Sequence, residues 1–234
     1  MAENKTTDDA PDYLGHRERL RKRFLLGGGK DMPDYELLEL LLMIALPRRD
    51  VKPLAKEMIK KFGSFAEVIN APLEELMSFS GVKENTATVL KIVRECSIRT
   101  SWQNLKSADA PIINNFDAMV DYCRSAMAYQ TVEEFRIIFL NSKLHVIAEE
   151  VQQRGTVDQV AIHPREVIKS AMMHGASAMI LVHNHPSGIV TPSKADIEIT
   201  KRIREAGEAV SIRLFDHLII SKSSVYSFHN EGFV

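Results

Sequence analysis

Residues 178–188 read Ala178-Met-Ile-Leu-Val-His183-Asn184-His185-Pro186-Ser187-Gly188 and carry the strongest structural signal in this chain of 234 residues. The first five are an uninterrupted apolar run, which is typical of a strand buried on both faces. Pro186 and Gly188 break the strand and turn the chain into a loop. Residues 194–206, which follow this loop, have a helical pattern. We therefore predict a buried strand, a loop and a helix in succession, as in an α/β layer.

Strand and helix patterns alternate through the rest of the second half. β-branched and aromatic residues in short runs mark the strands, and a longer apolar period marks the helices. We expect strands at 135–140, 145–148, 214–220 and 225–228, and helices at 164–175 and 194–206. Together these elements predict a sheet that is covered by helices.

The first half reads as helices separated by prolines and glycines, and it gives no strand signal. Residues 101–115 are polar and contain Pro111, so the sequence predicts a linker near 105–112. The chain is therefore expected to have a flexible N-terminus at 1–15, an all-α domain at 16–105 and an α/β domain at 112–234.

The composition is that of an ordinary soluble globular protein, with 45% apolar and 26% charged residues and a net charge of −1. The longest apolar run, at 40–46, is far shorter than the ~20 residues of a membrane span. The polar, acidic start has no apolar core of the kind found in signal peptides. Cys96 and Cys123 are too few for a disulfide framework. We expect a cytoplasmic protein with reduced thiols and no membrane partner.

Two of the eight histidines stand at the end of the buried strand. His183 and His185 point to the same face, because side chains alternate along a strand. Ser193 and Asp196 fall on the first turn of the next helix. Two imidazoles and one carboxylate make up the three-ligand set of a catalytic zinc site. Ser193-x-x-Asp196 also fits a capping box, a helix-start arrangement that involves no metal.

A zinc site of this kind needs a base that takes a proton from the attacking water, and a carboxylate is the usual choice. Glu149 and Glu150 close the strand pattern that begins at His145. Alternation puts their side chains on opposite faces, so at most one of them points at the zinc. A pair of glutamates at a strand end is also compatible with simple solvation.

The spacing His183-x-His185-x₇-Ser193-x-x-Asp196 is similar to the JAMM motif of the MPN-domain metalloproteases. Longer blocks resemble, in order, those of the bacterial RadC family, and this resemblance covers nearly the whole chain. The blocks are Arg154-Gly-Thr-Val-Asp, His163-Pro-Arg-Glu-Val, His183-Asn-His-Pro-Ser-Gly, Pro192-Ser-Lys-Ala-Asp and Asp216-His217.

The resemblance implies an MPN (JAMM) fold, a curved sheet between helices that is related to the cytidine-deaminase architecture. It implies one zinc ion per chain with His183, His185 and Asp196 as ligands, and Ser193 helping to polarise the scissile carbonyl oxygen. The family's glutamate lies five residues before its Gly-Thr pair, which is the position of Glu150 here. The resemblance therefore favours Glu150 over Glu149 as the catalytic base.

The first half resembles the helical N-terminal domain of the same family, which contains a helix-hairpin-helix-like element. Residues 78–87 match that element in outline, but Lys83 replaces its second glycine. Glycines there let backbone amides approach a phosphate, so phosphate binding would fall to the lysine side chain. Arg19, Arg21 and Arg23 form a basic run that could also contact nucleic acid. A purely structural helical bundle and a solvated helix face remain the alternatives.

Asp216 and His217 precede the final strand pair. They are candidates for a hydrogen bond to a ligand imidazole. An ordinary structural contact explains them equally well.

The leading hypothesis is a zinc-dependent hydrolase of metalloprotease or isopeptidase type that acts on an unidentified protein or peptide. The alternative is a nucleic-acid-associated protein, in keeping with the DNA-repair label of the RadC family, in which the zinc domain is accessory and the N-terminal domain contacts DNA. Deaminase chemistry fits poorly, because Cys96 and Cys123 do not form the Pro-Cys-x-x-Cys segment of zinc deaminases.

Overall fold

The computed structural model describes residues 15–107, 111–155 and 162–234. Contacts between residues divide the chain into two compact units, Met1–Glu95 and Cys96–Val234. The division lies inside helix α6, which spans Glu84–Ser107. It therefore falls before the linker predicted near 105–112. Residues 108–110 and most of the expected flexible segment 1–15 lie outside the described residues, so the predicted domain limits stay predictions.

Helix α6 extends into the polar stretch that suggested a linker because its last turns carry an apolar face. Ile98, Trp102 and Leu105 recur at helical spacing and pack into the core of the second unit. Leu90, nearer the start of α6, is fully buried in the core of the first unit. The two ends of one helix thus contribute to different cores.

The described part of the first unit is entirely helical, as the sequence predicts. Local signals explain where its helices begin: the Ser64 hydroxyl accepts a hydrogen bond from the backbone of Glu67, and proline stands in the first turn of α3. The helices before α6 are α1 His16–Gly27, α2 Asp34–Ala45, α3 Lys52–Phe62, α4 Phe65–Asn70 and α5 Leu73–Met77.

The second unit contains one mixed five-stranded sheet with the order β2-β1-β3-β4-β5. The pair β3–β4 is parallel, and the other three pairs are antiparallel. The strands are β1 Glu134–Leu140, β2 Val146–Arg154, β3 Ala178–Asn184, β4 Arg213–Ile220 and β5 Val225–Ser227. The helices are the short η1 Ile112–Asn115, α7 Phe116–Met127, α8 Pro164–Met173 and α9 Lys194–Glu208.

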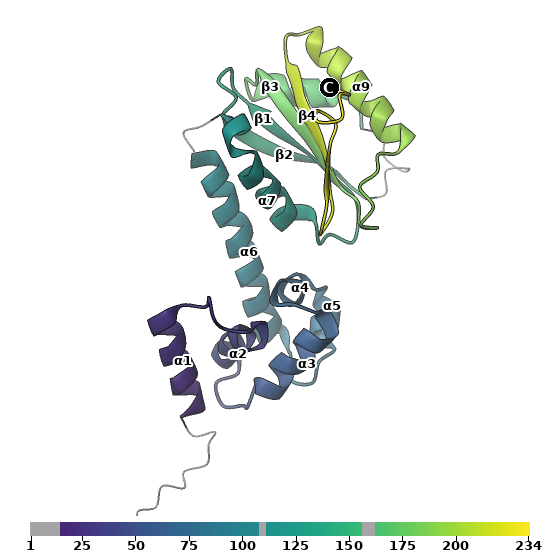
Figure 1. Cartoon of the computed structure of the whole chain (residues 1–234). Helices are drawn as coiled ribbons and strands as arrows, with labels where there is room; N and C mark the ends of the chain where they lie inside the picture. Colours follow the sequence, from purple (N-terminus) through teal and green to yellow (C-terminus); the bar gives the residue numbers. More distant parts are fainter. Residues whose placement is uncertain (1–14, 108–110, 156–161) are drawn as a thin grey trace, which may run out of the picture. The chain divides into compact units, whose positions relative to one another are not determined.

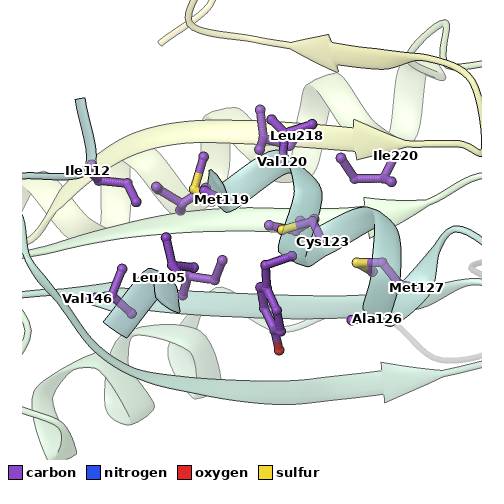
Figure 2. Close-up of a cluster of buried hydrophobic side chains, with 14 of the residues drawn as sticks. Leu105, Ile112, Met119, Val120, Cys123, Ala126, Met127, Val146, Leu218 and Ile220 are labelled. Atoms are coloured by element: carbon purple, nitrogen blue, oxygen red, sulfur yellow. The ribbon is translucent and has the colours of Figure 1, made fainter. Parts of the chain in front are cut away.

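Helices cover both faces of this sheet, with α7 on one face and α9 on the other (Figure 1). On the α7 face, Met119, Cys123 and Met127 pack against strand side chains such as Ile180 and Leu218. Figure 2 shows this cluster, including the labelled Leu105 from α6. The face covered by α8 and α9 has its own core, which contains Phe139, Leu181 and Ile203 among its buried members.

Every residue of β3 is buried, because the strand lies between β1 and β4 with helices on both sides. The prediction of a strand buried on both faces is confirmed. The sheet between helices is consistent with the expected α/β domain. Across the described ranges, no helix combines the length and apolar character that spanning a membrane requires.

Candidate metal centre

The three predicted ligands come together at the end of β3. His183 Nε2 lies 3.0 Å from His185 Nε2 and 3.3 Å from Asp196 Oδ1. His185 Nε2 lies 3.8 Å from Asp196 Oδ2. One nitrogen from each imidazole and one carboxylate oxygen thus all lie within 4.8 Å of one another. This donor set, two nitrogens and an oxygen, suits a divalent ion such as zinc.

Strand alternation produces this convergence, as predicted. Asn184, between the two histidines, turns to the other side, where its Oδ1 accepts a hydrogen bond from the Glu134 amide at 2.7 Å. Its Nδ2 donates to the Val132 carbonyl at 3.1 Å. The His185 amide donates to the Ile220 carbonyl at 3.0 Å, which keeps His185 aligned with β4.

Hydrogen bonds also fix the proton positions on both ligand imidazoles. His185 Nδ1 lies 2.6 Å from the Ile189 carbonyl. A carbonyl oxygen only accepts, so Nδ1 carries the proton and Nε2 keeps its lone pair. The Nε2 lone pair of His185 therefore faces the cluster.

A longer chain of hydrogen bonds fixes the proton position on His183. Thr200 Oγ1 donates to the carbonyl of Asp196, so its oxygen accepts from His217 Nδ1 at 2.6 Å. His217 Nε2 is then unprotonated and accepts from His183 Nδ1 at 2.8 Å. This leaves the Nε2 lone pair of His183 facing the cluster. Of the predicted pair at 216–217, His217 is thus the residue that contacts a ligand imidazole.

Burial keeps the imidazoles of His183 and His217 neutral. Desolvation lowers the pKa of His183 to about 4, with nearby Asp196 opposing the shift and His185 adding to it. Desolvation also lowers the pKa of the fully buried His217 well below its ordinary value. Neutral imidazole is the form that binds a metal. The residues present therefore fit the zinc that the donor set suggests.

Ser193 and Asp196 form the predicted capping box at the start of α9. The Ser193 hydroxyl accepts from the Asp196 amide at 3.1 Å, and Asp196 Oδ2 accepts from the Ser193 amide at 2.7 Å. The hydroxyl of Ser193 also lies 2.7 Å from Oδ2 and donates to it. Asp196 therefore caps the helix through Oδ2 and directs Oδ1 towards His183, so the two explanations for this pair are compatible.

Asp216 serves the backbone around the site. Its buried carboxylate accepts from Ser227 Oγ at 2.7 Å and from the amides of His217 at 2.7 Å and His229 at 2.9 Å. Burial raises the pKa of Asp216, and these three bonds partly offset that rise. None of these bonds reaches a ligand imidazole.

Glu150 does not join the cluster. Its carboxylate hydrogen-bonds to Ser170 and contacts Gln152 Nε2 at 2.9 Å and His174 Nε2 at 3.3 Å. Glu149 points to the opposite face, where it contacts Arg136 Nη1 at 3.2 Å, so the predicted alternation is confirmed.

Sheet register explains why Glu150 is distant from the ligands. It pairs with Ile137 of β1, which pairs in turn with Leu181 of β3, two residues before His183. Glu150 therefore lies on the same face as His183, but two strand spacings away, roughly 10 Å across the sheet.

A different carboxylate, that of Glu133, lies beside the cluster. Phe135 pairs with His183 across β1 and β3, and their rings stack with centroids 6.1 Å apart. Glu133 is two residues before Phe135 and so faces the same side. Its carbonyl accepts from the Gly155 amide at 2.9 Å, which continues the strand geometry. The adjacent Glu134 turns to the other face and binds Arg136.

Glu133 also lines a cavity of about 230 Å³ that reaches the ligands. Within the described ranges, no hydrogen bond or ion pair engages its half-buried carboxylate. The described residues around this cavity are Glu133, Glu134, Phe135, Gly155, Ile162, His183, Ala195, Asp196, Glu198, Ile199 and Arg202. Sequence reasoning missed Glu133, although it directly precedes the predicted strand at 135–140.

The predicted nucleic-acid contacts lie in the first unit. Arg19 and Arg23 are one turn apart on α1, and Arg21 lies on another side of that helix. Arg23 forms an ion pair with Glu36. Lys83 is exposed in the turn just before α6. The basic run is thus divided between two sides of one helix.

Comparisons with known proteins match both parts of the chain. The family model described as a RadC-like JAB domain matches residues 113–233, and the UPF0758 N-terminal model matches residues 13–88. A UPF0758 protein of Ruegeria pomeroyi is 48% identical over 225 residues, which cover 96% of this chain and 100% of that protein. A UPF0758 protein of Rhodobacter capsulatus is 50% identical over 213 residues, which cover 91% and 99%. Neither name states an activity.

The hydrogen-bond chain predicts that Thr200 controls metal affinity without touching the metal. Thr200→Val keeps the side-chain shape but removes the acceptor for His217 Nδ1, so the proton position of His217, which orients His183, is no longer fixed. We expect zinc affinity to fall about tenfold, measured by competition with a chromophoric chelator. Thr200→Ser restores the hydroxyl and should restore the affinity. Equal affinities in wild type and Thr200→Val would show that the chain does not orient the ligand.

Proposed function

We propose that this chain, which belongs to the family of RadC-like JAB-domain proteins, is a zinc-dependent hydrolase of metalloprotease or isopeptidase type with JAMM chemistry. One observation carries the proposal. Two imidazole lone pairs and a carboxylate oxygen converge beside a cavity that also holds a carboxylate engaged by no other described residue. A three-ligand site of this kind is typical of catalytic rather than structural zinc.

His183, His185 and Asp196 would hold one zinc ion per chain. When bound, zinc supplies a Lewis acid that polarises a carbonyl and lowers the pKa of water. The protein's own contribution is orientation, because the bonds of His185 to Ile189 and of His183 to His217 hold both imidazoles towards one point.

Glu133 is the general base that the geometry favours. It would take a proton from the water whose oxygen bonds to the amide carbon, and would deliver that proton to the nitrogen as the carbon–nitrogen bond breaks. The products are a carboxylic acid and an amine. Glu150, which the family resemblance favoured for this role, is held by Ser170 and His174 instead.

Ser193 would assist at the carbonyl oxygen. Its exposed hydroxyl donates to Asp196 Oδ2 and sits next to the ligand set. By rotating about its side-chain bond, it would donate instead to the oxygen of the scissile carbonyl and stabilise the charge that develops there.

The two glutamates provide a direct test of this mechanism. Glu133→Gln removes the base and keeps the side-chain size, so zinc content should stay at one ion per chain while amide hydrolysis falls 10²–10⁴-fold. Glu150→Gln is the matched variant and should keep both zinc and turnover. Zinc is measured by mass spectrometry, and turnover by cleavage of a mixed peptide library.

Other outcomes would separate the roles. Loss of turnover in Glu150→Gln with full turnover in Glu133→Gln would restore Glu150, the base that the family resemblance implies. Full turnover in both variants would contradict a carboxylate base, and a wild-type protein that binds no zinc would contradict the proposed function itself.

Two further proposals concern the architecture of the second unit and the cellular setting of the protein. A relation to the cytidine-deaminase architecture is supported by the mixed sheet with helices on both faces. A cytoplasmic setting is supported by the two free thiols, exposed Cys96 and buried Cys123. Burial raises the pKa of Cys123 to about 12, which keeps this thiol protonated and unreactive.

DNA binding by the first unit is a second candidate function, and one contact favours it. In the turn between α5 and α6, Gly81 has a φ of +87° and the exposed Arg49 guanidinium lies directly against it. This side chain and Lys83 place two cations at the hairpin, where the second glycine is missing. Phosphate binding would then rely on side chains more than on backbone amides.

Salt dependence tests this second candidate. The full-length protein should bind a fluorescein-labelled 20-base-pair duplex more weakly as salt rises, because phosphate contacts release counterions. Replacing Arg49 and Lys83 by alanine should weaken binding and lower the salt slope by about one unit per lost contact. Fluorescence anisotropy measures both. Undetectable or salt-insensitive binding would count against a DNA partner.

A further inference from the structure

The cavity beside the metal centre is a groove along one side of α9. Ala195, Glu198, Ile199 and Arg202 line it at helical spacing, and Phe135 of β1 also lines it. The groove begins next to the ligand Asp196 and extends to Arg202. A helix rises 1.5 Å per residue, so the distance along α9 from Ala195 to Arg202 is about 10 Å. An extended peptide covers that distance in about three residues.

The chemical character of the groove changes along its length. Its middle is apolar, with Phe135, Ile162 and Ile199 among its walls. At the far end stands the exposed guanidinium of Arg202, for which the structure shows no hydrogen bond or ion pair to any described residue. The groove therefore offers an apolar passage that ends in an available cation.

The neighbouring cations on α9 are occupied. Lys201 lies 3.9 Å from Glu205, and Arg204 lies 3.9 Å from Glu208 and donates to the Phe233 carbonyl at 2.7 Å. Both pairs are one helical turn apart, with the acid on the C-terminal side. Arg202 differs from these neighbours because it faces the groove.

Glu198 is the acid nearest to Arg202 along the groove wall. It stands one turn before Arg202, yet no ion pair within 4.0 Å joins the two exposed side chains. Its charge would repel an anion that enters the groove. Arg202 presents a planar fork that binds a carboxylate through two parallel hydrogen bonds, which Glu198 leaves available.

We propose that the groove binds a short extended peptide segment next to the scissile amide, with apolar side chains in the middle and a carboxylate at Arg202. The proposal rests on the proposed function, since the metal centre fixes the position of the amide. The carboxylate is either the C-terminus of a chain or the side chain of an aspartate or glutamate. The substrate class is thus a peptide with an apolar residue and a negative charge within about three residues of the cleaved bond.

Peptide probes that carry a zinc-binding hydroxamate test the groove for a preference for a carboxylate, and they do so without requiring turnover. Succinyl-hydroxamate-Leu-Leu spans about three residues and is made with a free carboxylate or a carboxamide end. Succinyl-hydroxamate-Leu-Asp-amide and its Leu-Asn-amide partner carry the charge on a side chain instead. Binding to the zinc-loaded full-length protein is measured by calorimetry. We expect at least one acid probe to bind about tenfold more tightly than its neutral partner.

Variants assign that preference to Arg202. Arg202→Gln should remove the preference for the charged probe, and Glu198→Gln should increase it. Lys201→Gln is the matched control, because it removes the same charge from the adjacent residue, which does not line the groove, and it should leave the preference unchanged. Zinc content and the circular dichroism spectrum confirm that each variant is folded and loaded.

The outcomes separate the two proposals. Preference for the acid in the Leu-Leu pair alone identifies a chain terminus, and preference in the Leu-Asp pair alone identifies an acidic side chain. Equal binding of charged and neutral probes, with zinc and hydroxamate bound, would overturn the groove assignment and leave the hydrolase proposal intact. Absence of zinc, or of binding by every hydroxamate, would overturn both.

Discussion

The hydrogen-bond chain from His183 through His217 and Thr200 to the backbone of Asp196 is the constraint on which the site depends. It joins the end of β3, the middle of β4 and the first turns of α9. Because its last acceptor is a carbonyl, every proton along the chain has one possible position. The imidazole of His183, a predicted ligand on the strand, is thereby oriented towards the start of the helix that carries Asp196.

The fold supports this chain by burying it. β3 and β4 are parallel neighbours, and α9 connects them and packs over the same face. Burial excludes water that would compete for the imidazole protons, and it favours neutral histidines. The same placement of α9 creates the groove, since the helix that supplies Asp196 at its start carries Arg202 two turns later. Ligand geometry and the groove therefore share one structural origin.

Local pattern in the sequence was enough to predict that His183, His185 and Asp196 come together. His183 and His185 follow from strand alternation, and Ser193 and Asp196 follow from the spacing of one helical turn, so neither depends on distant contacts. Glu133 could not be found this way, because its position depends on β1 pairing with β3, and the strand order of a sheet is not written in any local period. Glu150 was favoured through the family resemblance, but the register places it two strands from His183.

The division of the chain into two units also depends on contacts between distant residues, which local sequence patterns do not reveal. Polar residues at 101–115 suggested a linker near 105–112, whereas Trp102 and Leu105 among them form an apolar helix face that only the second core reveals. The position of His217 beside His183 likewise required the pairing of β3 with β4. Resemblance supplied the family, and the geometry added the carboxylate and the cation that line its groove.

The zinc K-edge X-ray absorption spectrum of the full-length, zinc-loaded protein tests the metal centre most directly. We predict four-coordinate zinc with two imidazoles and only nitrogen or oxygen ligands at about 2.0–2.2 Å. Sulfur scattering at about 2.3 Å, or a spectrum without imidazole ligands, would contradict this prediction.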